Sequence, residues 1–144
     1  MNQVIVDASV GVKWLFQEHD SSQAISVLHR FQRGEIKIIV PEIFYLEVAN
    51  TCWTKAKKKL ATVKQVIDSL DRINDLSLIK YSDQELADVA LENSLRFNTS
   101  VYDSLYLALA EIYLAPLITA DEALYNACRD RFDFIELLQD VSPH

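Results

Sequence analysis

The chain has 144 residues, close to the size of one domain, and half of them are hydrophobic, which is enough for one buried core. Only two glycines and three prolines occur, which argues against a disordered chain and a Gly/Pro-rich β-sandwich. The net charge of −7 is unusual for a protein that grips nucleic acid through its phosphates. It suits a carboxylate cluster that binds metal ions, or a basic protein partner.

No feature of the sequence indicates a secreted, membrane or zinc protein. The chain opens on a strand pattern without a signal sequence, and no apolar run is long enough to span a bilayer. Cys52 and Cys128 lack a CxxC spacing, and His19, His29 and His144 lack the spacing of metal ligands. We therefore expect a soluble, cytoplasmic protein with two buried free cysteines, although the sequence leaves a disulfide open.

The first half of the chain predicts two strands and four helices. The β-branched run 4–6 and the apolar run 36–40 have the character of strands buried on both faces. Asp20 and Gln23 have the spacing of a capping box, and Gly34 is placed to end the helix that follows them. The helices are expected at 9–17, at 21–33, from Pro41 to about Leu60, and at 62–76.

The second half continues this alternation. Ser82 and Glu85 have the pattern of a capping box, and Pro116 follows the end of an apolar helix that Ser100 opens. Short strands are expected at 78–81, 117–119 and 134–138, and helices at 83–97, 100–114 and 121–131. The whole pattern predicts an α/β fold: one three-layer domain over residues 1–144, with a short, mainly parallel central sheet flanked by helices.

Four acidic residues are expected to meet beyond the carboxyl ends of these strands, where such sheets bind ligands. Asp7 and Asp121 follow strands, Glu47 lies on a polar helix stripe, and Asp103 is the only charged residue between Arg96 and Glu111. Taken singly, each has a structural alternative as a helix cap, a dipole partner or a solvated side chain. Together, two charges about 4 Å apart repel by about 4 kcal/mol at an effective dielectric near 20, so the cluster favours binding of divalent cations.

Four motifs of the chain, in this order, resemble the PIN-domain family, and within it the VapC-type toxins of VapBC toxin–antitoxin pairs. They are VIVDASV at 4–10 with KW at 13–14, PEI and EVAN within 41–50, YDSLYLALA at 102–110, and LITAD at 117–121. The resemblance covers nearly the whole chain and implies a three-layer PIN-like fold. Ser104 stands where alanine is common and Glu122 follows Asp121, but neither departure removes a ligand, and Glu122 is expected to cap its helix.

The resemblance also implies a site and partners. One or two Mg²⁺ or Mn²⁺ ions would be bound by Asp7, Glu47, Asp103 and Asp121. Of these four, Asp7 and Asp103 are the residues most expected to be direct ligands. Ser9 and Thr119 would hold carboxylates or water around them. A small antitoxin protein and a second copy of the chain, forming a homodimer, are the implied partners.

The implied activity is that of an endoribonuclease. It would hydrolyse RNA phosphodiester bonds with a water oriented by Asp121 or Glu47, leaving 5′-phosphate and 3′-hydroxyl ends. The alternative is a catalytically weak or inactive PIN-like module that acts through a protein partner. A phosphorylated receiver domain fits less well, because it needs a second acid after the first strand and Ala8 and Ser9 do not provide one.

Two groups of side chains have open interpretations at this stage. The densest basic patch is either an RNA contact or the solvated end of a helix, and it consists of Lys55, Lys57, Lys58, Lys59 and Lys64. Five aromatic residues lie at helical spacing, which favours core or dimer packing over the stacking of bases. They are Trp14, Tyr45, Trp53, Tyr106 and Tyr113.

Overall fold

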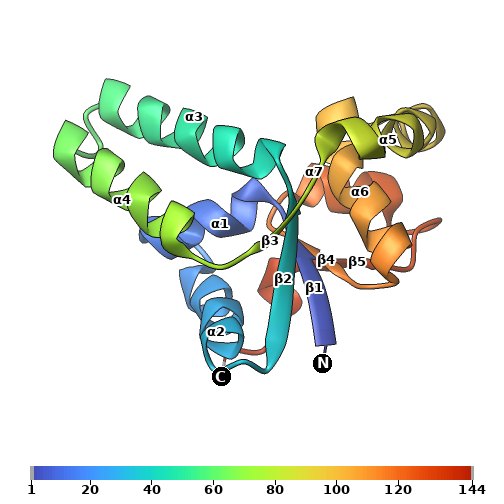
Figure 1. The fold of residues 1–144 in the computed structure, drawn as a ribbon, viewed down its shortest axis with the longest axis horizontal. Coiled ribbons are helices and arrows are strands. Elements are labelled where there is room, and N and C mark those ends of the chain that lie inside the picture. Colours follow the sequence, from blue (N-terminus) through green and yellow to red (C-terminus); the bar gives the residue numbers. More distant parts are fainter. Residues whose placement is uncertain (1, 144) are drawn as a thin grey trace.

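A five-stranded parallel sheet lies at the centre of residues 2–143, the part of the chain that the computed structural model describes (Figure 1). The strand order is β3-β2-β1-β4-β5, and every neighbouring pair is parallel. The strands are β1 (Asn2–Val6), β2 (Ile36–Pro41), β3 (Ile79–Tyr81), β4 (Leu117–Thr119) and β5 (Ile135–Leu137). The expected α/β fold with a parallel sheet is confirmed.

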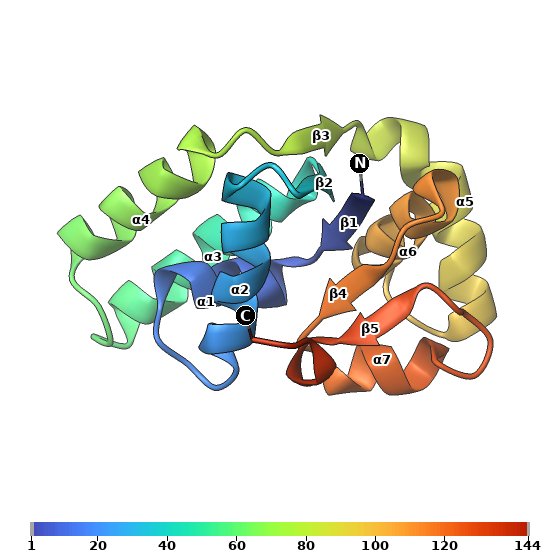
Figure 2. The same cartoon turned by 90° about the horizontal axis from the view of Figure 1, so that it is seen from below.

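The helices cover the sheet on both faces (Figures 1 and 2). On one side lie α1 (Ala8–Leu15), α2 (Ser21–Gln32), α3 (Ile43–Lys57) and α4 (Val63–Asp75). On the other side lie α5 (Asp83–Phe97), α6 (Val101–Tyr113) and α7 (Glu122–Cys128), and a 3₁₀ turn (Leu138–Asp140) follows β5. The pair α3 and α4 extends away from the sheet, whereas α6 packs directly on β1 and β2. None of the helices within 2–143 combines the length and the apolar character needed to cross a membrane.

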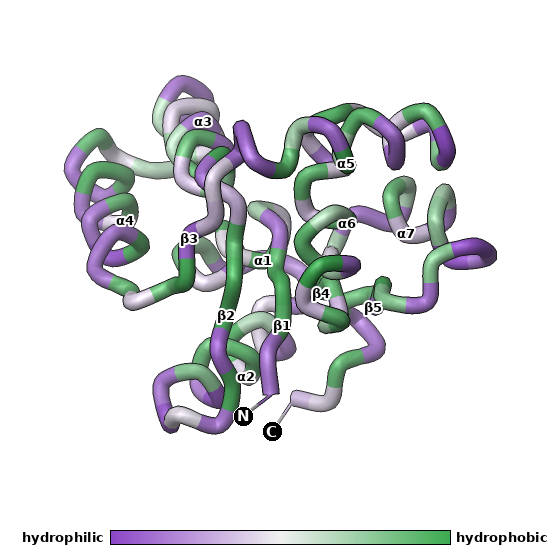
Figure 3. The backbone as a smooth tube through the Cα atoms, turned by 45° about the vertical axis from the view of Figure 1, so that its right-hand side comes forward, coloured by the Kyte–Doolittle hydropathy of each residue, from purple (hydrophilic) through white to green (hydrophobic). Residues whose placement is uncertain are grey.

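β1 occupies the middle of the sheet, with β2 on one side and β4 on the other. Its residues Ile5 and Val6 are fully buried because helices cover both faces. In Figure 3 the tubes of β1 and β2 are hydrophobic toward their carboxyl ends and hydrophilic nearer their amino ends. Val6 pairs with Ile118 of β4. The next residue of each strand therefore emerges at the same carboxyl edge of the sheet, and these two residues are Asp7 and Thr119.

Some expected boundaries and caps are wrong. Pro41 ends β2 opposite Tyr81 instead of opening a helix, because the N–H of Glu42 still donates to the Tyr81 carbonyl at 3.1 Å. Asp20 and Gln23 form no capping box, since Asp20 has a φ of 62° and its side chain makes no cap hydrogen bond. The other elements lie within a few residues of the expected ranges.

Two glycines have distinct structural roles. Gly34 has a φ of +76° and follows the end of α2, as expected for a helix-ending glycine. Gly11 is buried where α1 meets α3, and a Cβ atom there would lie 2.7 Å from Cζ of Phe44. The missing side chain of Gly11 thus allows α1 to pack closely against α3. Cys52 and Cys128 are both free and buried, as expected.

Candidate functional site

Asp7 is held at the carboxyl end of β1 by two hydroxyl groups. Thr119 Oγ1 donates to Asp7 Oδ2 at 2.5 Å, and Ser9 Oγ donates to Asp7 Oδ1. Both hydroxyls are held in turn by backbone N–H groups, of Asp121 to Thr119 (3.0 Å) and of Ala120 to Ser9 (2.9 Å). Asp7 occupies the N-cap position of α1 but makes no side-chain cap bond. Its carboxylate is therefore oriented mainly by the hydroxyls of Ser9, in the first turn of α1, and Thr119, the last residue of β4.

The electrostatic environment of Asp7 disfavours its charge. Burial raises the pKa of the Asp7 carboxyl to about 6 from its ordinary 3.8, although the hydroxyls of Ser9 and Thr119 lower it. The neighbouring charge of Asp103 adds a smaller increase to the pKa of Asp7. Asp7 is 6 % exposed and has no cationic partner among residues 2–143. A bound cation would favour the charged form of this carboxylate.

Glu47 comes to the site from α3 and is held by a residue of α6. The hydroxyl of Tyr106 donates to Glu47 Oε1 at 2.5 Å, and the Tyr106 side chain is 1 % exposed. Burial raises the pKa of Glu47, the Tyr106 hydrogen bond lowers it, and Asp103 and Asp83 raise it. Burial is the main reason that the pKa of Tyr106 lies well above 10, and the negative charge of Glu47 raises this pKa further. The phenol is therefore a proton donor to Glu47 at any ordinary pH.

Asp103 and Asp121 come from the first turn of α6 and the N-cap of α7. The backbone N–H of Asp103 donates to Ser100 Oγ at 3.0 Å, so Ser100 is the cap and the Asp103 carboxylate is not needed for it. Burial raises the pKa of Asp103, and the charge of Asp121 raises it further. Asp121 Oδ1 accepts from the N–H of Leu124 at 3.1 Å, so Asp121 caps α7.

The expected cap of α7 by Glu122 does not form. The hydroxyl of Thr119 is used by Asp7 and by the N–H of Asp121, so the cap of α7 falls to Asp121. Glu122 is exposed in the first turn of α7, where its charge favours the helix dipole.

The negative charges of the four predicted acids affect the pKa values of their neighbours in the site. Asp103 raises the pKa of both Asp7 and Glu47, and Asp121 raises that of Asp103. Within the described part of the chain, none of the four forms an ion pair with a lysine, arginine or histidine. Uncompensated, mutually repelling carboxylates fit a hard divalent cation as their partner.

The four acids do not form a closed metal cage. Among residues 2–143, no group of three histidine, cysteine or acidic side chains is close enough to hold an ion as placed. This spacing is compatible with Mg²⁺, which usually keeps several waters and binds through one or two carboxylates. The oxygen donors of these carboxylates therefore fit a hard divalent ion of this kind.

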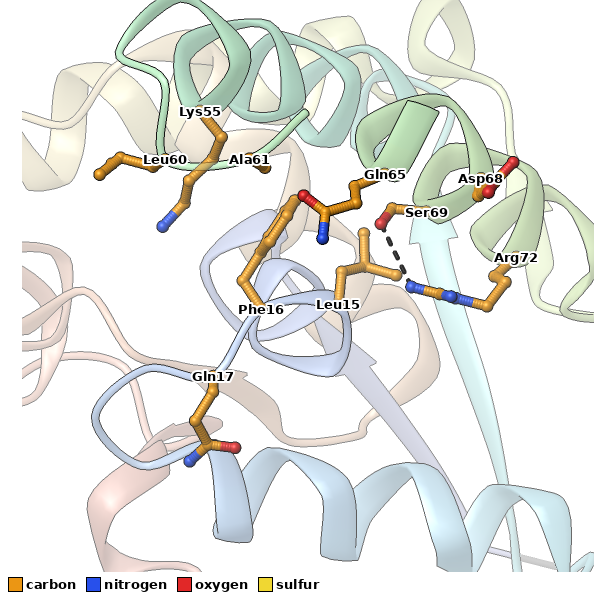
Figure 4. A pocket seen from close by; sticks show the side chains of 10 residues that line it. All are labelled: Leu15, Phe16, Gln17, Lys55, Leu60, Ala61, Gln65, Asp68, Ser69 and Arg72. Carbon is orange, nitrogen blue, oxygen red and sulfur yellow. Dashed lines mark hydrogen bonds between the residues drawn. The ribbon is translucent and has the colours of Figure 1, made fainter. Parts of the chain in front are cut away.

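Two clefts of about 540 Å³ each flank α3, and only one of them reaches the acids. The first, which we call the α1–α3 cleft, includes Ser9 and Glu47 in its wall; its other lining residues are Ala8, Val12, Ile43, Leu46, Asn50, Thr51 and Tyr102. The second lies between the ends of α1, α3 and α4 and contains Lys55 and Arg72 but none of the four acids (Figure 4). The α1–α3 cleft is the one that belongs to the candidate site.

The lysines of the predicted basic patch are only partly available to a ligand. Lys55 is half-buried and pairs with Glu18 at 2.6 Å, and it points into the second cleft (Figure 4). Lys57 lies over the ring of Trp53 at 4.7 Å. Lys58 and Lys59 are exposed at the far end of α3, and Lys64 pairs with Asp68 on α4.

Two tyrosines at the site were not identified from the sequence. Tyr106 was expected to be a core residue, which it is, but its hydroxyl also holds Glu47. Tyr102 precedes Asp103 and is 61 % exposed in the α1–α3 cleft. The signal in the sequence that could have identified Tyr102 is its position directly before Asp103, a proposed metal ligand. Of the other aromatic residues, Trp14 packs with Phe44 and Tyr113 with Tyr81, whereas Trp53 is exposed.

Comparison with known proteins agrees with this architecture. The family model of the PIN domain matches residues 4–130. Ribonuclease VapC3 of Pyrobaculum aerophilum is 27 % identical over 124 residues, which cover 85 % of this chain and 92 % of that protein.

Solved structures with the same fold include three proteins at low sequence identity. PAE2754 from Pyrobaculum aerophilum has a TM-score of 0.71 at 19 % identity, over 96 % of this chain and 85 % of that one. VapBC2 from Rickettsia felis, bound to a DNA fragment from its promoter, has a TM-score of 0.64 at 16 % identity, with 94 % and 98 % covered. A toxin–antitoxin complex from Klebsiella pneumoniae has a TM-score of 0.63 at 15 % identity, with 98 % of both chains covered. The family match extends over most of the sequence, from the strand that precedes Asp7 to beyond Asp121, and the chain belongs to the PIN-domain family.

Proposed function

We propose that this protein is a divalent-metal-dependent endoribonuclease that hydrolyses RNA phosphodiester bonds, acting in the cytoplasm as the toxin of a toxin–antitoxin pair. The observation that carries the proposal is the set of four acids, Asp7, Glu47, Asp103 and Asp121, from four separate segments at one edge of the sheet. Asp103 raises the pKa of Asp7 and of Glu47, Asp121 raises that of Asp103, and none of the four forms an ion pair within residues 2–143. Similarity to Ribonuclease VapC3 supports RNA as the substrate.

Each acidic residue has a proposed role that fits its environment. Asp7 and Asp103 are the principal ligands of Mg²⁺ or Mn²⁺, with Ser9 and Thr119 fixing the orientation of Asp7. When bound, the ion stabilises charge on the phosphoryl oxygens and makes water more acidic. Glu47 and Asp121 each have one carboxylate oxygen engaged by the protein, at Tyr106 and Leu124. The second oxygen of either residue is available to orient the attacking water and accept its proton.

The proposed protein partner is a small antitoxin with a basic segment. The net charge of −7 and the acidic site favour a positively charged inhibitor, since complementary charge steers association. The similar structures from Klebsiella pneumoniae and Rickettsia felis are toxin–antitoxin and VapBC proteins. We also propose a homodimer, for which the exposed apolar residues of α3 and α5, such as Trp53 and Leu95, provide surface.

The test is RNA cleavage by the wild type and by Asp103→Asn, each with Mn²⁺ and with EDTA. Asn keeps the shape of Asp and leaves the Ser100 cap intact, because the cap uses the backbone N–H of residue 103. It lacks the charge that binds a hard cation. We expect cleavage by the wild type to stop in EDTA, and Asp103→Asn to lose cleavage by orders of magnitude while its thermal melt without metal is unchanged or higher.

Asp88→Asn is the matched control, since Asp88 is an exposed acid of α5 outside the cluster. It should cleave like the wild type. Cleavage that persists in EDTA, or in Asp103→Asn, would contradict the proposed mechanism. A wild-type protein that binds its antitoxin but cleaves no RNA would instead favour the inactive binding module.

A further inference from the structure

We propose that the α1–α3 cleft is a nucleobase subsite, which binds the base next to the phosphate that is cut. Tyr102 is the stacking surface of this subsite, and Asn50 is the polar group that contacts the edge of the base. The proposal rests on the proposed ribonuclease function, and it names the part of the substrate that the protein recognises beside the cleavage site.

The cleft has the size and position that such a subsite requires. Its volume of about 540 Å³ lies within the range of sites that enclose small organic groups, about 300 to 1,000 Å³. Ser9 and Glu47 form part of its wall, and Tyr102 directly precedes Asp103. A nucleotide whose phosphate lies at the acids therefore has this cleft immediately beside it.

The walls of the cleft suit a flat, neutral group. Val12 and Ile43 provide apolar surface, and Leu46 and Tyr102 are 72 % and 61 % exposed. Proteins bind unstacked RNA bases on aromatic side chains of this kind. Among residues 2–143, no lysine or arginine lines the cleft, and Glu47 is the only charged residue in its wall. The cleft therefore disfavours a phosphate and favours a base.

The charge of the whole protein leads to the same conclusion. With a net charge of −7, the chain gains little from contacts with RNA phosphates outside the metal site. In the predicted basic patch, Lys55 is engaged by Glu18 and Lys57 lies over Trp53. Lys58 and Lys59 are exposed beyond the end of α3 and do not line the α1–α3 cleft. Within the α1–α3 cleft, affinity for RNA must then come largely from uncharged contacts with the base.

Asn50 provides the directional contact. It lies on α3 three residues after Glu47, hence on the same side of the helix, and it is exposed in the cleft. Its carboxamide makes no hydrogen bond within residues 2–143, so both its donor and its acceptor are available. Thr51 beside it donates to the Glu47 carbonyl at 3.2 Å and keeps only acceptor capacity. An amide is the side chain that pairs with a base edge presenting a donor beside an acceptor.

The experiment compares an intact RNA with one that lacks a single base. The cleavage site is first mapped on a mixed RNA pool, and kcat/KM is then measured for an oligoribonucleotide and for copies with an abasic ribose on either side of the cut. Loss of base stacking corresponds to about 1 to 3 kcal/mol, or roughly 5-fold to 150-fold. We expect a loss in this range for Tyr102→Ala on intact RNA, and no further loss on the abasic copy that leaves the cleft empty.

The variants and controls separate stacking from other effects. Tyr102→Phe keeps the ring and should cleave within a few-fold of the wild type, and Asn50→Ala should change the preference among the four bases at that one position. Trp53→Ala removes an exposed aromatic residue of α3 outside the cleft and should affect intact and abasic RNA equally. The dependence of kcat/KM on salt should be shallow, since few phosphates are contacted.

Several results would overturn the proposal. One is an equal loss of kcat/KM for Tyr102→Ala on intact and on abasic RNA. If light scattering also shows that Tyr102→Ala no longer dimerises, the cleft is covered by a second copy of the chain and not by a base. Another is a steep salt dependence with no effect of Tyr102→Ala. Fluorescence anisotropy of wild type and Tyr102→Ala with oligoadenylate, oligouridylate and a base-free oligomer tests the cleft without cleavage. Base-dependent binding that requires Tyr102, in a protein that cuts no RNA, would support the subsite and contradict the nuclease function.

Discussion

Thr119 Oγ1 donates a 2.5 Å hydrogen bond to Oδ2 of Asp7, across two neighbouring parallel strands. The contact follows from the register, because Val6 pairs with Ile118 and the next residues of both strands lie side by side. The same hydroxyl accepts the N–H of Asp121 at 3.0 Å. One side chain thus fixes the position of Asp7 relative to the segment that carries Asp121.

Replacing Thr119 should therefore weaken the site without changing the fold. Thr119→Val keeps the shape of this fully buried side chain but removes the hydroxyl. Loss of a group that orients a metal ligand typically lowers metal affinity or activity by about 10-fold to 100-fold. We expect a decrease of that size in Mn²⁺ affinity, measured by calorimetry, and in RNA cleavage. Thr119→Ser retains the hydroxyl and should recover most of both; if it is as impaired as Thr119→Val, the hydroxyl is not the reason.

The metal-free protein should become less stable as the pH rises from about 4 to about 6. The folded protein holds the Asp7 proton with a pKa of about 6, against an ordinary 3.8, so it binds the proton more tightly than the unfolded chain does. The free energy of unfolding therefore falls through this interval, by about 3 kcal/mol for Asp7 at 1.36 kcal/mol per pH unit, and levels off above it. The raised pKa values of Glu47 and Asp103 act in the same direction.

Urea unfolding in EDTA at several pH values between 4 and 8 measures this effect. Asp7→Asn cannot titrate, so its unfolding free energy should vary less with pH and should exceed that of the wild type at pH 7.5. Mn²⁺ at pH 7.5 should stabilise the wild type, because it binds the folded state only. Equal pH dependence for the wild type and Asp7→Asn would show that burial of Asp7 is not the cause.

Features that depend on the order of the strands and on the periodicity of apolar residues could be predicted from the sequence. A buried β-branched run followed by Asp7, and a second followed by Thr119 and Asp121, predicts convergence once the sheet is parallel. Short-range capping patterns were less dependable. Asp20 and Gln23 have the spacing of a cap, but the backbone at Asp20 adopts the left-handed conformation and the cap is lost.

Contacts between helices that are far apart in the sequence could not be predicted from the sequence. Tyr106 lies on an apolar helix face, where periodicity indicates only burial, and nothing local shows that its hydroxyl reaches a residue on α3. The exposure of Tyr102 and the closeness of α1 to α3 at Gly11 likewise depend on how helices pack. The periodicity of apolar residues indicates which face of a helix is buried, whereas these features depend on how closely that helix approaches the neighbouring helix.

Gly11→Ala should destabilise the protein. The added methyl would lie 2.7 and 2.9 Å from two ring carbons of Phe44, which is itself fully buried and in contact with Trp14 and Tyr45. Overpacking of this kind costs about 1 to 3 kcal/mol, more than the gain in helix propensity from Gly to Ala. Chemical denaturation measures the change in unfolding free energy. Gly11→Ala combined with Phe44→Leu makes room for the methyl and should lose less than the sum of the two single changes.

Tyr106→Phe tests whether the hydrogen bond to Glu47 matters for the site. The variant keeps the buried ring and removes only the hydroxyl, so the core should remain packed. Without that donor, Glu47 is free to take other rotamers, and its pKa should rise because the hydrogen bond that lowers it is gone. We expect weaker Mn²⁺ binding by calorimetry, by about 10-fold. The acidic limb of the pH–rate profile for RNA cleavage should also move to higher pH.

Tyr113→Phe is the control for Tyr106→Phe, since Tyr113 lies on the same helix, contacts Tyr81 through its ring and makes no hydrogen bond through its hydroxyl within residues 2–143. It should bind Mn²⁺ and cleave RNA like the wild type. A merely structural role of Tyr106 would lower the thermal stability of Tyr106→Phe but leave its metal affinity and pH profile in place. If both variants behave alike in these two measurements, Glu47 does not depend on the phenol for its position, and the contact between α3 and α6 contributes to stability alone.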